Sequence, residues 1–392
     1  MQDLVQMQND IKKYIIQNKR IKIPKKNISV ELKVIGGLSN CNYIGIIKNM
    51  STNEKILQVI YRRFGALSDC VNHVLEASLI DYLAQKGIGP KLFYEDPSGS
   101  YRIIEFIDGA YNIERPKGLE PYIMSKIYPI LNSYCLFSYT YRYNIRNEKI
   151  LLSPILNDGI ENRRNDITKN QYETCTTEYL DKAKNVFSKF YNQFKAKINP
   201  QTNPKDYEDM EFIQYYLDNY KELFTEMHPS SGFMVLNHND IHRLNFLLRK
   251  KDQKLFLLDH EYAYLNLPGI DISNYLNETY FNYEPTYYCT LDKVDFDKTF
   301  PYYTKFITDF IESHKFIEKE EGGEEFIKKI KSKKYFIALH NIINLFWFVW
   351  SICYVDFQKW EKDHYEEYYI VHGIDRIKMY LIGKKAMEKI KE

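Results

Sequence analysis

The first hundred or so residues show the pattern of a β-rich segment with one helix. Short strand-like apolar runs at 34–35, 43–47 and 56–60 are separated by Gly36-Gly37 and polar residues, and such runs return at 92–94 and 101–107. Apolar residues at helical spacing fill 72–85, and Gly87 marks the end of that run. The predicted order is therefore strands, one helix, and strands again.

Helical spacing dominates after Gly109. Apolar residues recur every three or four positions over 178–198, 206–224, 302–314 and 335–354. The pattern predicts an α+β fold with a small β-rich lobe at 1–110 and a larger, mostly helical lobe at 111–392.

Two polar stretches interrupt this pattern. Residues 144–177 are predicted to form a loop or excursion on the surface. Residues 318–334 carry many charges and Gly322-Gly323, which predicts a solvated helix end or a mobile linker.

Composition narrows the class of protein. The chain has 392 residues, 44% hydrophobic and 27% charged, with a net charge of +2. These values are ordinary for a soluble globular protein and give no electrostatic case for nucleic acid or an anionic membrane as the partner. The six cysteines are scattered without a CxxC pair, which argues against a zinc module or disulfide framework and favours a cytoplasmic setting.

No integral membrane segment is expected. Residues 1–20 lack the uninterrupted apolar core of a signal peptide. Residues 335–354 are long enough to span a bilayer, but they include His340, Asn341 and Asn344. Because such polar groups are costly in lipid, this segment is predicted to be a buried helix.

A polar motif in the larger lobe carries the candidate chemistry. Asn245 stands five residues after Asp240, and Asp259 ends the apolar run 255–258. These are the polar parts of a kinase-type phosphoryl-transfer site, in which the first Asp accepts a hydroxyl proton and the other two residues hold Mg²⁺ against ATP phosphates.

The spacing between Asn245 and Asp259 is that of a β-hairpin. Residues 246–248 and 255–258 predict two short strands around a polar turn, and such a hairpin would bring Asn245 and Asp259 to the same end. The alternative is a hairpin with solvated polar ends, because short motifs also match by chance.

Two features of the first lobe fit phosphate binding. Gly36-Gly37-Leu38-Ser39-Asn40 lies between two strands, where backbone N–H groups and the two polar side chains can bind phosphate oxygens; an ordinary hairpin has the same pattern. Either Arg62 or Arg63 can pair with phosphates, with Glu76 holding it from the next helix. Strand alternation sends the two arginines to opposite faces, so only one can point inward.

The strand end Glu105-Phe106-Ile107 can contribute to nucleotide recognition. A segment that joins two lobes can offer backbone C=O and N–H groups to adenine, although the sequence itself shows only a strand followed by a turn.

The segment after the metal strand offers further candidates. Asp271 follows the turn Pro268-Gly269 and can brace the catalytic loop from beneath, and Glu278 lies one to two helical turns later, towards the acceptor site. Trp347 and Trp350 share one helix face. Core packing is their ordinary role, but two indole faces can also hold an organic cation, at roughly 0.5–2 kcal/mol per contact.

In this order, the motifs resemble those of the choline/ethanolamine kinases. The similarity runs from about residue 30 to the C-terminus, apart from 144–177. It rests on Gly36 to Asn40, Val59 to Gly65, Glu76, Gly89-Pro90-Lys91-Leu92, Glu105 to Ile107, His238-Asn239-Asp240 with Asn245, Asp259-His260-Glu261-Tyr262, Asp271 to Asn274, Asn277-Glu278, and Trp347 with Trp350. The resemblance implies a protein-kinase-like two-lobed fold and ATP-dependent phosphorylation of choline or ethanolamine, the first step towards the corresponding phospholipid.

The resemblance also implies roles for individual residues. Asp240 is the base, Asn245 and Asp259 bind Mg²⁺, residues 36–40 and Arg62 contact phosphates, and 105–107 contact adenine. The amino-alcohol pocket is formed by Asp240, Tyr262, Glu278, Tyr283, Trp347 and Trp350, with His242 and His372 at positions that differ from the family. The resemblance further implies a homodimer.

Four positions depart from the family pattern. His260 replaces the usual Phe between two acids, and Thr279 replaces a Trp. His372 stands where a pocket Tyr is usual, and His242 is neither the Gln of some choline kinases nor the Leu of many ethanolamine kinases. Substrate preference is therefore left open.

Three alternatives to a choline kinase remain. The first is an ethanolamine kinase, and the second is an aminoglycoside-type kinase, against which the paired tryptophans argue. The third is a catalytically dead, kinase-like binding module, against which the presence of Asp240, Asn245 and Asp259 argues.

Overall fold

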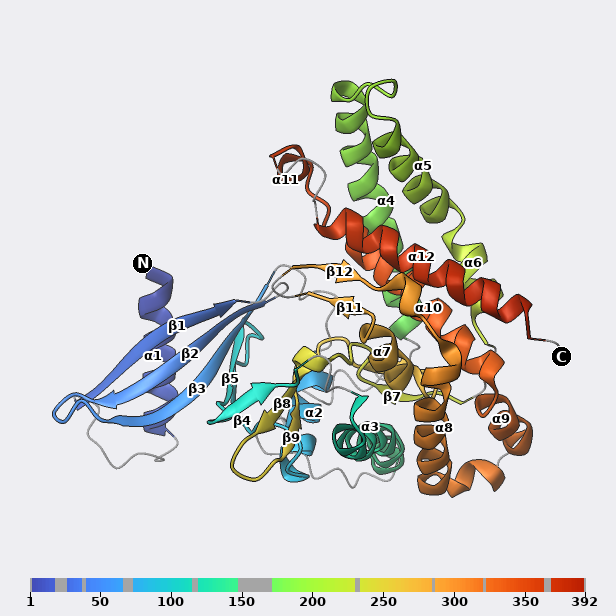
Figure 1. The fold of residues 1–392 in the computed structure, drawn as a ribbon. Coiled ribbons are helices and arrows are strands. Elements are labelled where there is room, and N and C mark those ends of the chain that lie inside the picture. Colours follow the sequence, from blue (N-terminus) through green and yellow to red (C-terminus); the bar gives the residue numbers. More distant parts are fainter. Residues whose placement is uncertain are drawn as a thin grey trace. The chain divides into compact units, whose positions relative to one another are not determined.

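The computed structural model describes residues 2–17, 27–36, 40–65, 73–114, 119–146, 171–229, 233–283, 286–319, 322–362 and 368–390. These residues form two compact units, whose elements are labelled in Figure 1. The first unit holds the described residues up to 114 together with 244–263, and the second holds 119–146, 171–243 and 264–390. Asp240 thus belongs to the second unit, whereas Asn245 and Asp259 belong to the first. The lobe boundary near residue 110 stays a prediction.

An antiparallel sheet of five strands forms the centre of the first unit, in the order β1-β2-β3-β5-β4. The strands are β1 Ile28–Gly36, β2 Asn40–Asn49, β3 Lys55–Phe64, β4 Leu92–Glu95 and β5 Tyr101–Glu105. Helix α1 (Gln2–Gln17) packs Ile11 and Tyr14 into the same apolar cluster as strand residues, and α2 (His73–Gln85) packs Ile80 with Leu92. The predicted β-rich start and its main helix are confirmed.

A smaller sheet completes the first unit, in the order β6-β8-β9. Its strands are β6 Ala110–Asn112, β8 Phe246–Arg249 and β9 Leu255–Leu257. Phe246 pairs with Leu257 across β8 and β9, so the predicted hairpin is confirmed.

The second unit is mostly helical. Its helices are α3 Pro121–Arg146, α4 Gln171–Lys197, α5 Pro204–Asp218, α6 Tyr220–Met227, α7 Ile270–Glu278, α8 Phe296–Ser313, α9 Gly323–Ile330, α10 Lys333–Ile352, α11 Phe357–Lys362 and α12 Tyr368–Glu388. Two short antiparallel pairs accompany them: β7 Val235–Asn237 with β10 Tyr264–Asn266, and β11 Phe281–Asn282 with β12 Tyr288–Cys289.

Helix α10 is the core of the second unit. All its residues from Tyr335 to Ile352 are buried, and α12 runs beside it (Figure 1). By length and composition α10 could cross a membrane, but its apolar window is wholly buried in the structure, as predicted for a core helix. The close approach to α12 depends on Gly383, where a Cβ would lie 1.9 Å from Asn341 Oδ1.

Three predicted segments differ from the structure. Residues 206–224 form two helices, because Asn219 ends α5 and donates its side-chain amide to Tyr215 O at 2.8 Å. The predicted surface loop 144–177 is helical at both described ends, and 147–170 lie outside the described residues. The charged run 318–334 contains helix α9, which buries Phe326 and Ile330 on one face.

Candidate active site

The loop that carries Asp240 follows β7 and is held from α7. Asp271 accepts hydrogen bonds from the backbone N–H groups of His238 and Asn239, both at 2.8 Å. Asn239 has a φ of 65°, a left-handed conformation that Asn tolerates better than most residues. Its side-chain oxygen accepts from Asn266 Nδ2 at 2.8 Å. These bonds fix the backbone immediately before the predicted base.

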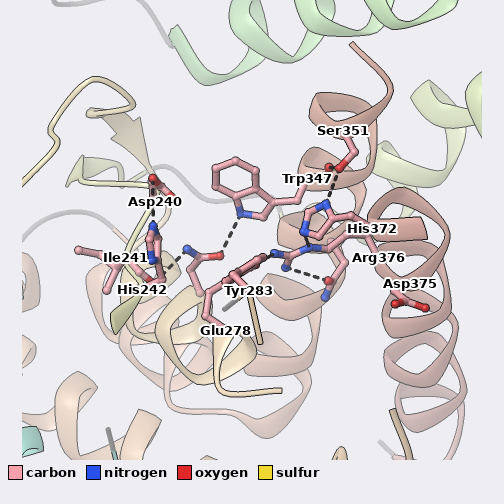
Figure 2. A network of polar contacts seen from close by, with 12 residues as sticks. Asp240, Ile241, His242, Glu278, Tyr283, Trp347, Ser351, His372, Asp375 and Arg376 are labelled. Carbon is pink, nitrogen blue, oxygen red and sulfur yellow. Dashed lines mark hydrogen bonds and ion pairs between the residues drawn. The ribbon is translucent and has the colours of Figure 1, made fainter. Parts of the chain in front are cut away.

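Two carboxylates, those of Asp271 and Asp240, interact electrostatically at this loop. Burial, with a smaller contribution from the charge of Asp240, raises the pKa of Asp271 to about 7, although two backbone N–H groups act to lower it. Asp240 itself is partly exposed, and its Oδ2 lies 3.7 Å from His242 Nε2 (Figure 2). The sequence singled out His242 as a departure, and the structure places it beside the predicted base.

The two predicted metal ligands lie at one end of the β8–β9 hairpin. The backbone N–H of Leu258 donates to Asn245 O at 2.9 Å, and Asp259 follows directly. Asp259 has a φ of 62°, which is uncommon for a residue other than glycine. Its side chain is 39% exposed, so its carboxylate is accessible to a cation.

Arg62 is the inward-pointing arginine of β3. Its Nη2 lies 2.7 Å from Asp259 Oδ1 and 2.9 Å from Glu261 Oε2, and its Nη1 lies 3.3 Å from Glu76 Oε1. Burial by itself would lower the pKa of Arg62, but the three carboxylates outweigh it and raise that pKa. Arg63 points away, is half-exposed and pairs with Asp3 at 3.1 Å.

Glu76 on α2 is shared by two buried arginines. Arg102 Nη1 lies 2.8 Å from Glu76 Oε2, and Arg102 Nε lies 2.9 Å from Glu95 Oε2. Burial would raise the pKa of Glu76, but Arg102 and Arg62 hold it well below its usual range. Glu76 therefore keeps a charged partner in Arg102 whatever Arg62 binds.

The predicted phosphate loop is described only at its two ends. Gly36 ends β1, Asn40 begins β2, and Gly37, Leu38 and Ser39 lie outside the described residues. Asn40 is buried, donates to Glu261 Oε2 and accepts from the backbone N–H of Gly65 at 3.3 Å.

The predicted adenine segment ends β5. The backbone N–H of Glu105 donates to Lys91 O at 2.8 Å, and Glu105 Oε2 accepts from Lys91 N at 3.1 Å. Phe106 is half-buried and Ile107 is buried. The predicted adenine contacts of these residues stay a prediction.

Helix α10 contributes two neighbouring tryptophans to the second unit. The rings of Trp347 and Trp350 lie 5.3 Å apart at 79°, edge to face. Trp350 also contacts Tyr354 at 4.7 Å and Tyr369 at 6.0 Å, and these two tyrosines stack at 5.3 Å. Tyr369 lies one helical turn before His372 on α12.

Asn274 connects Trp347 to the loop that carries Asp240. Its Oδ1 accepts from Trp347 Nε1 at 3.1 Å, and its Nδ2 donates to Ile241 O at 3.2 Å (Figure 2). Ile241 follows Asp240 directly, so one carboxamide positions an indole ring relative to the predicted base.

Glu278 is the last residue of α7. It pairs with Arg376 of α12 and accepts from Tyr283 OH at 2.6 Å. Arg376 Nε donates to His372 Nε2 at 3.1 Å (Figure 2). The remaining predicted pocket residue, Tyr262, is buried in the first unit, so its place in a substrate pocket stays a prediction.

Sequence reasoning assigned no role to three residues of this arrangement, of which only Asn274 was named, as part of a motif. Arg376 could have been noticed as a charge four positions after His372 in an apolar helix, and Asn274 as a polar residue one helical turn after Asp271. Arg102 gives no such signal, because a single arginine in a strand is most often exposed.

The chain matches the family model for choline/ethanolamine kinase over residues 32–381. The chain belongs to the choline/ethanolamine kinase family. It is therefore a kinase, with ATP as its co-substrate and an alcohol as its acceptor.

Relatives within the choline/ethanolamine kinase family carry both substrate names. The chain is 26% identical to a probable ethanolamine kinase of Arabidopsis thaliana over 329 residues, 83% of this chain and 72% of that protein. It is 24% identical to a choline/ethanolamine kinase of Rattus norvegicus over 340 residues, 81% of this chain and 72% of that protein. At these identities, relatedness does not choose between the two substrates.

Solved structures confirm the fold class. A choline kinase from Cryptosporidium parvum gives a TM-score of 0.62 at 19% identity, covering 96% of this chain and 95% of the other. An ethanolamine kinase from Plasmodium vivax gives a TM-score of 0.53 at 16% identity, covering 96% and 89%. The predicted α+β, protein-kinase-like fold is thus confirmed.

Proposed function

We propose that this kinase transfers the γ-phosphoryl group of ATP to the hydroxyl of choline, giving phosphocholine in the first step of phosphatidylcholine synthesis, and that it also accepts ethanolamine. The observation that carries the proposal is the Asn274 bridge, which ties Trp347 to the backbone next to Asp240. A base and an aromatic cation site belong together in an enzyme whose acceptor has a hydroxyl at one end and a cation at the other.

Asp240 orients the acceptor hydroxyl and takes its proton. The bond from the γ-phosphorus to the bridging oxygen of ATP breaks as the new phosphorus–oxygen bond to the alcohol forms, and ADP leaves. Asp271 acts as a positioning residue, because it holds the two backbone N–H groups before Asp240.

Asn245 and Asp259 would hold Mg²⁺. Both offer oxygen donors, which Mg²⁺ prefers, and the exposed carboxylate of Asp259 leaves room for water and phosphate ligands. When bound, the ion offsets negative charge on the phosphates. Residues 36–40 and Arg62 are proposed to bind phosphates as well, with Glu76 supporting Arg62 and residues 105–107 contacting adenine.

The proposed amino-alcohol site is formed by Tyr262, Glu278, Tyr283, Trp347 and Trp350, with His242 and His372 at the positions that differ from the family. Ethanolamine kinase activity is the second candidate, favoured by the names of two relatives. A cytoplasmic location and a homodimer are proposed from the resemblance alone.

The proposal is tested by ADP release with choline and ethanolamine side by side. The Asp240→Asn variant should lower kcat by about a hundredfold or more while ATP binding stays nearly intact, because only the proton acceptor is lost. Asp252→Asn, in the exposed hairpin turn, is the matched control and should leave kcat unchanged. Activity of the wild type with neither alcohol would overturn the proposed function, and near-normal turnover of Asp240→Asn would remove Asp240 from the base role.

A further inference from the structure

Arg376 is a permanently charged side chain inside the helical unit. It lies on α12 and is 1% exposed. Its Nη2 donates to Glu278 Oε1 and to Tyr283 OH, the latter at 3.0 Å. Burial alone would lower the pKa of Arg376, but Glu278 and Tyr283 outweigh it and raise that pKa. This arginine therefore remains a cation inside the second unit.

Glu278 is neutralised by this arginine. One of its oxygens pairs with Arg376, and the other accepts from Tyr283 OH at 2.6 Å. The sequence pattern predicted that Glu278 faces the acceptor site, where a carboxylate is a natural partner of a substrate cation. In the structure that charge already has an internal partner, so a substrate ammonium would have to compete with a buried guanidinium for it.

His372 fixes the orientation of the arginine. Arginine nitrogens only donate, so His372 Nε2 accepts from Arg376 Nε, and the imidazole proton must be on Nδ1. Nδ1 then donates to Ser351 Oγ at 2.6 Å, and Ser351 Oγ donates to Trp347 O at 2.6 Å (Figure 2). Burial and the charge of Arg376 both lower the pKa of His372, so its ring stays neutral and remains an acceptor.

Aromatic faces surround the same group. The guanidinium carbon of Arg376 lies 3.9 Å from the Phe281 ring centroid and 5.9 Å from that of Trp347. The Phe281 face is thus occupied by the arginine, and the aromatic group proposed for a substrate cation is the indole pair of Trp347 and Trp350, which meet edge to face at 5.3 Å. A fully alkylated ammonium has no N–H to donate, so it is bound by such faces through cation–π attraction, whereas a primary ammonium needs acceptors for three N–H groups.

We propose that Arg376 is a specificity-determining residue, held in place by His372: by keeping Glu278 in an internal ion pair, it leaves aromatic faces rather than a free carboxylate for the cationic end of the acceptor. The site then prefers a fully alkylated amino alcohol over one with a primary ammonium. This inference rests on the proposed function. It assigns to Arg376 and Glu278 the preference of the site among amino alcohols.

The test compares kcat/KM for choline and for ethanolamine in the wild type and in three variants. Wild type should favour choline. Arg376→Gln releases Glu278 and should lower the choline-to-ethanolamine ratio by about tenfold or more. Adding Glu278→Gln to that variant removes the released carboxylate and should restore the ratio towards the wild-type value. An unchanged ratio in Arg376→Gln, with both substrates losing efficiency together, overturns the proposal and makes Arg376 structural.

A milder variant covers the case in which Arg376→Gln does not fold. His372→Phe keeps an aromatic ring but removes the acceptor for Arg376 Nε, so the ratio should fall by about threefold. An unchanged ratio there overturns the positioning role of His372 and, if Arg376→Gln does not fold, the proposal itself.

Assays on the wild-type enzyme alone also distinguish failure of this inference from failure of the proposed function. Tetramethylammonium should compete with choline more strongly than methylammonium does. Activity with a preference for ethanolamine overturns this inference and leaves the proposed function standing, whereas inactivity with both alcohols overturns the proposed function.

Discussion

At the scale of single residues, position along a strand decides which of two neighbouring arginines is buried in the first unit. Arg62 and Arg63 are neighbours of the same type, and strand alternation assigns them to opposite faces. Arg62 is buried among Glu76, Asp259 and Glu261, and Arg63 is exposed beside Asp3. A guanidinium presents five N–H donors in a fixed planar fork, whereas an ammonium is a compact charge with three.

The contrast between the two arginines gives a paired prediction. Arg62→Lys should lower kcat/KM for MgATP by about tenfold or more, because a compact ammonium cannot reproduce the contacts of the fork. Arg63→Lys is the matched control on the same strand and should change neither kcat/KM nor the melting temperature. Equal kinetics of the two variants would contradict a role for Arg62 at the phosphates.

At the level of elements, helix α7 organises the helical part of the site. Asp271, Asn274 and Glu278 recur at helical spacing on one face and contact the catalytic loop, Trp347 and Arg376 respectively. All nine residues of this helix are buried. Its position therefore sets three contacts at once.

The start of α7 depends on Gly269, its N-cap. Gly269 has a φ of 87°, and a Cβ there would lie 2.8 Å from Tyr303 Cε2. Gly322, the N-cap of α9, has a φ of 75° with nothing within 4 Å of an added Cβ. The two glycines thus share backbone conformation and differ in packing.

Alanine at these two positions should separate backbone strain from overpacking. Gly322→Ala should lower the free energy of unfolding by about 1 kcal/mol, and Gly269→Ala by about 2–4 kcal/mol, because the clash adds to the strain. Urea unfolding followed by tryptophan fluorescence measures both variants. Equal losses would show that Tyr303 gives way without cost.

At the scale of the whole molecule, buried neutral histidines make the helical unit sensitive to acid. Burial lowers the pKa of His340 to about 4, and it also lowers the pKa values of His372 and His314. Between about pH 4 and 6.5 the unfolded chain therefore binds more protons than the folded one at these residues, and acid favours unfolding. Asp271 acts in the opposite sense, because its raised pKa stabilises the fold at low pH and loses that effect as pH rises to about 7.

His340 allows this sensitivity to be measured. Its titration should lower the free energy of unfolding by about 3 kcal/mol between pH 7 and pH 4, and His340→Gln should remove that part of the dependence. The readout is urea unfolding at several pH values, with the half-buried His228→Gln as control. A variant that keeps the wild-type pH dependence would contradict the assignment to His340.

The sequence by itself determined the fold class, the hairpin that brings Asn245 next to Asp259, and the buried helix at 335–354. Each of these follows from local periodicity or from a short run of apolar residues, which a chain carries in its order alone. The split between α5 and α6 escaped this reasoning, because it depends on how one asparagine caps a helix.

Only the tertiary structure decided what surrounds the predicted site residues. The sequence named Glu278 and His372. It could not show that Arg376 neutralises Glu278, or that His372 orients Arg376. Asn274 was named only as part of a motif, and the sequence could not show that it ties an indole ring to the loop that carries Asp240. Burial and pairing arise when elements far apart in the chain pack together, and these long-range contacts, rather than local pattern, set the charge that the helical part of the site presents to a substrate.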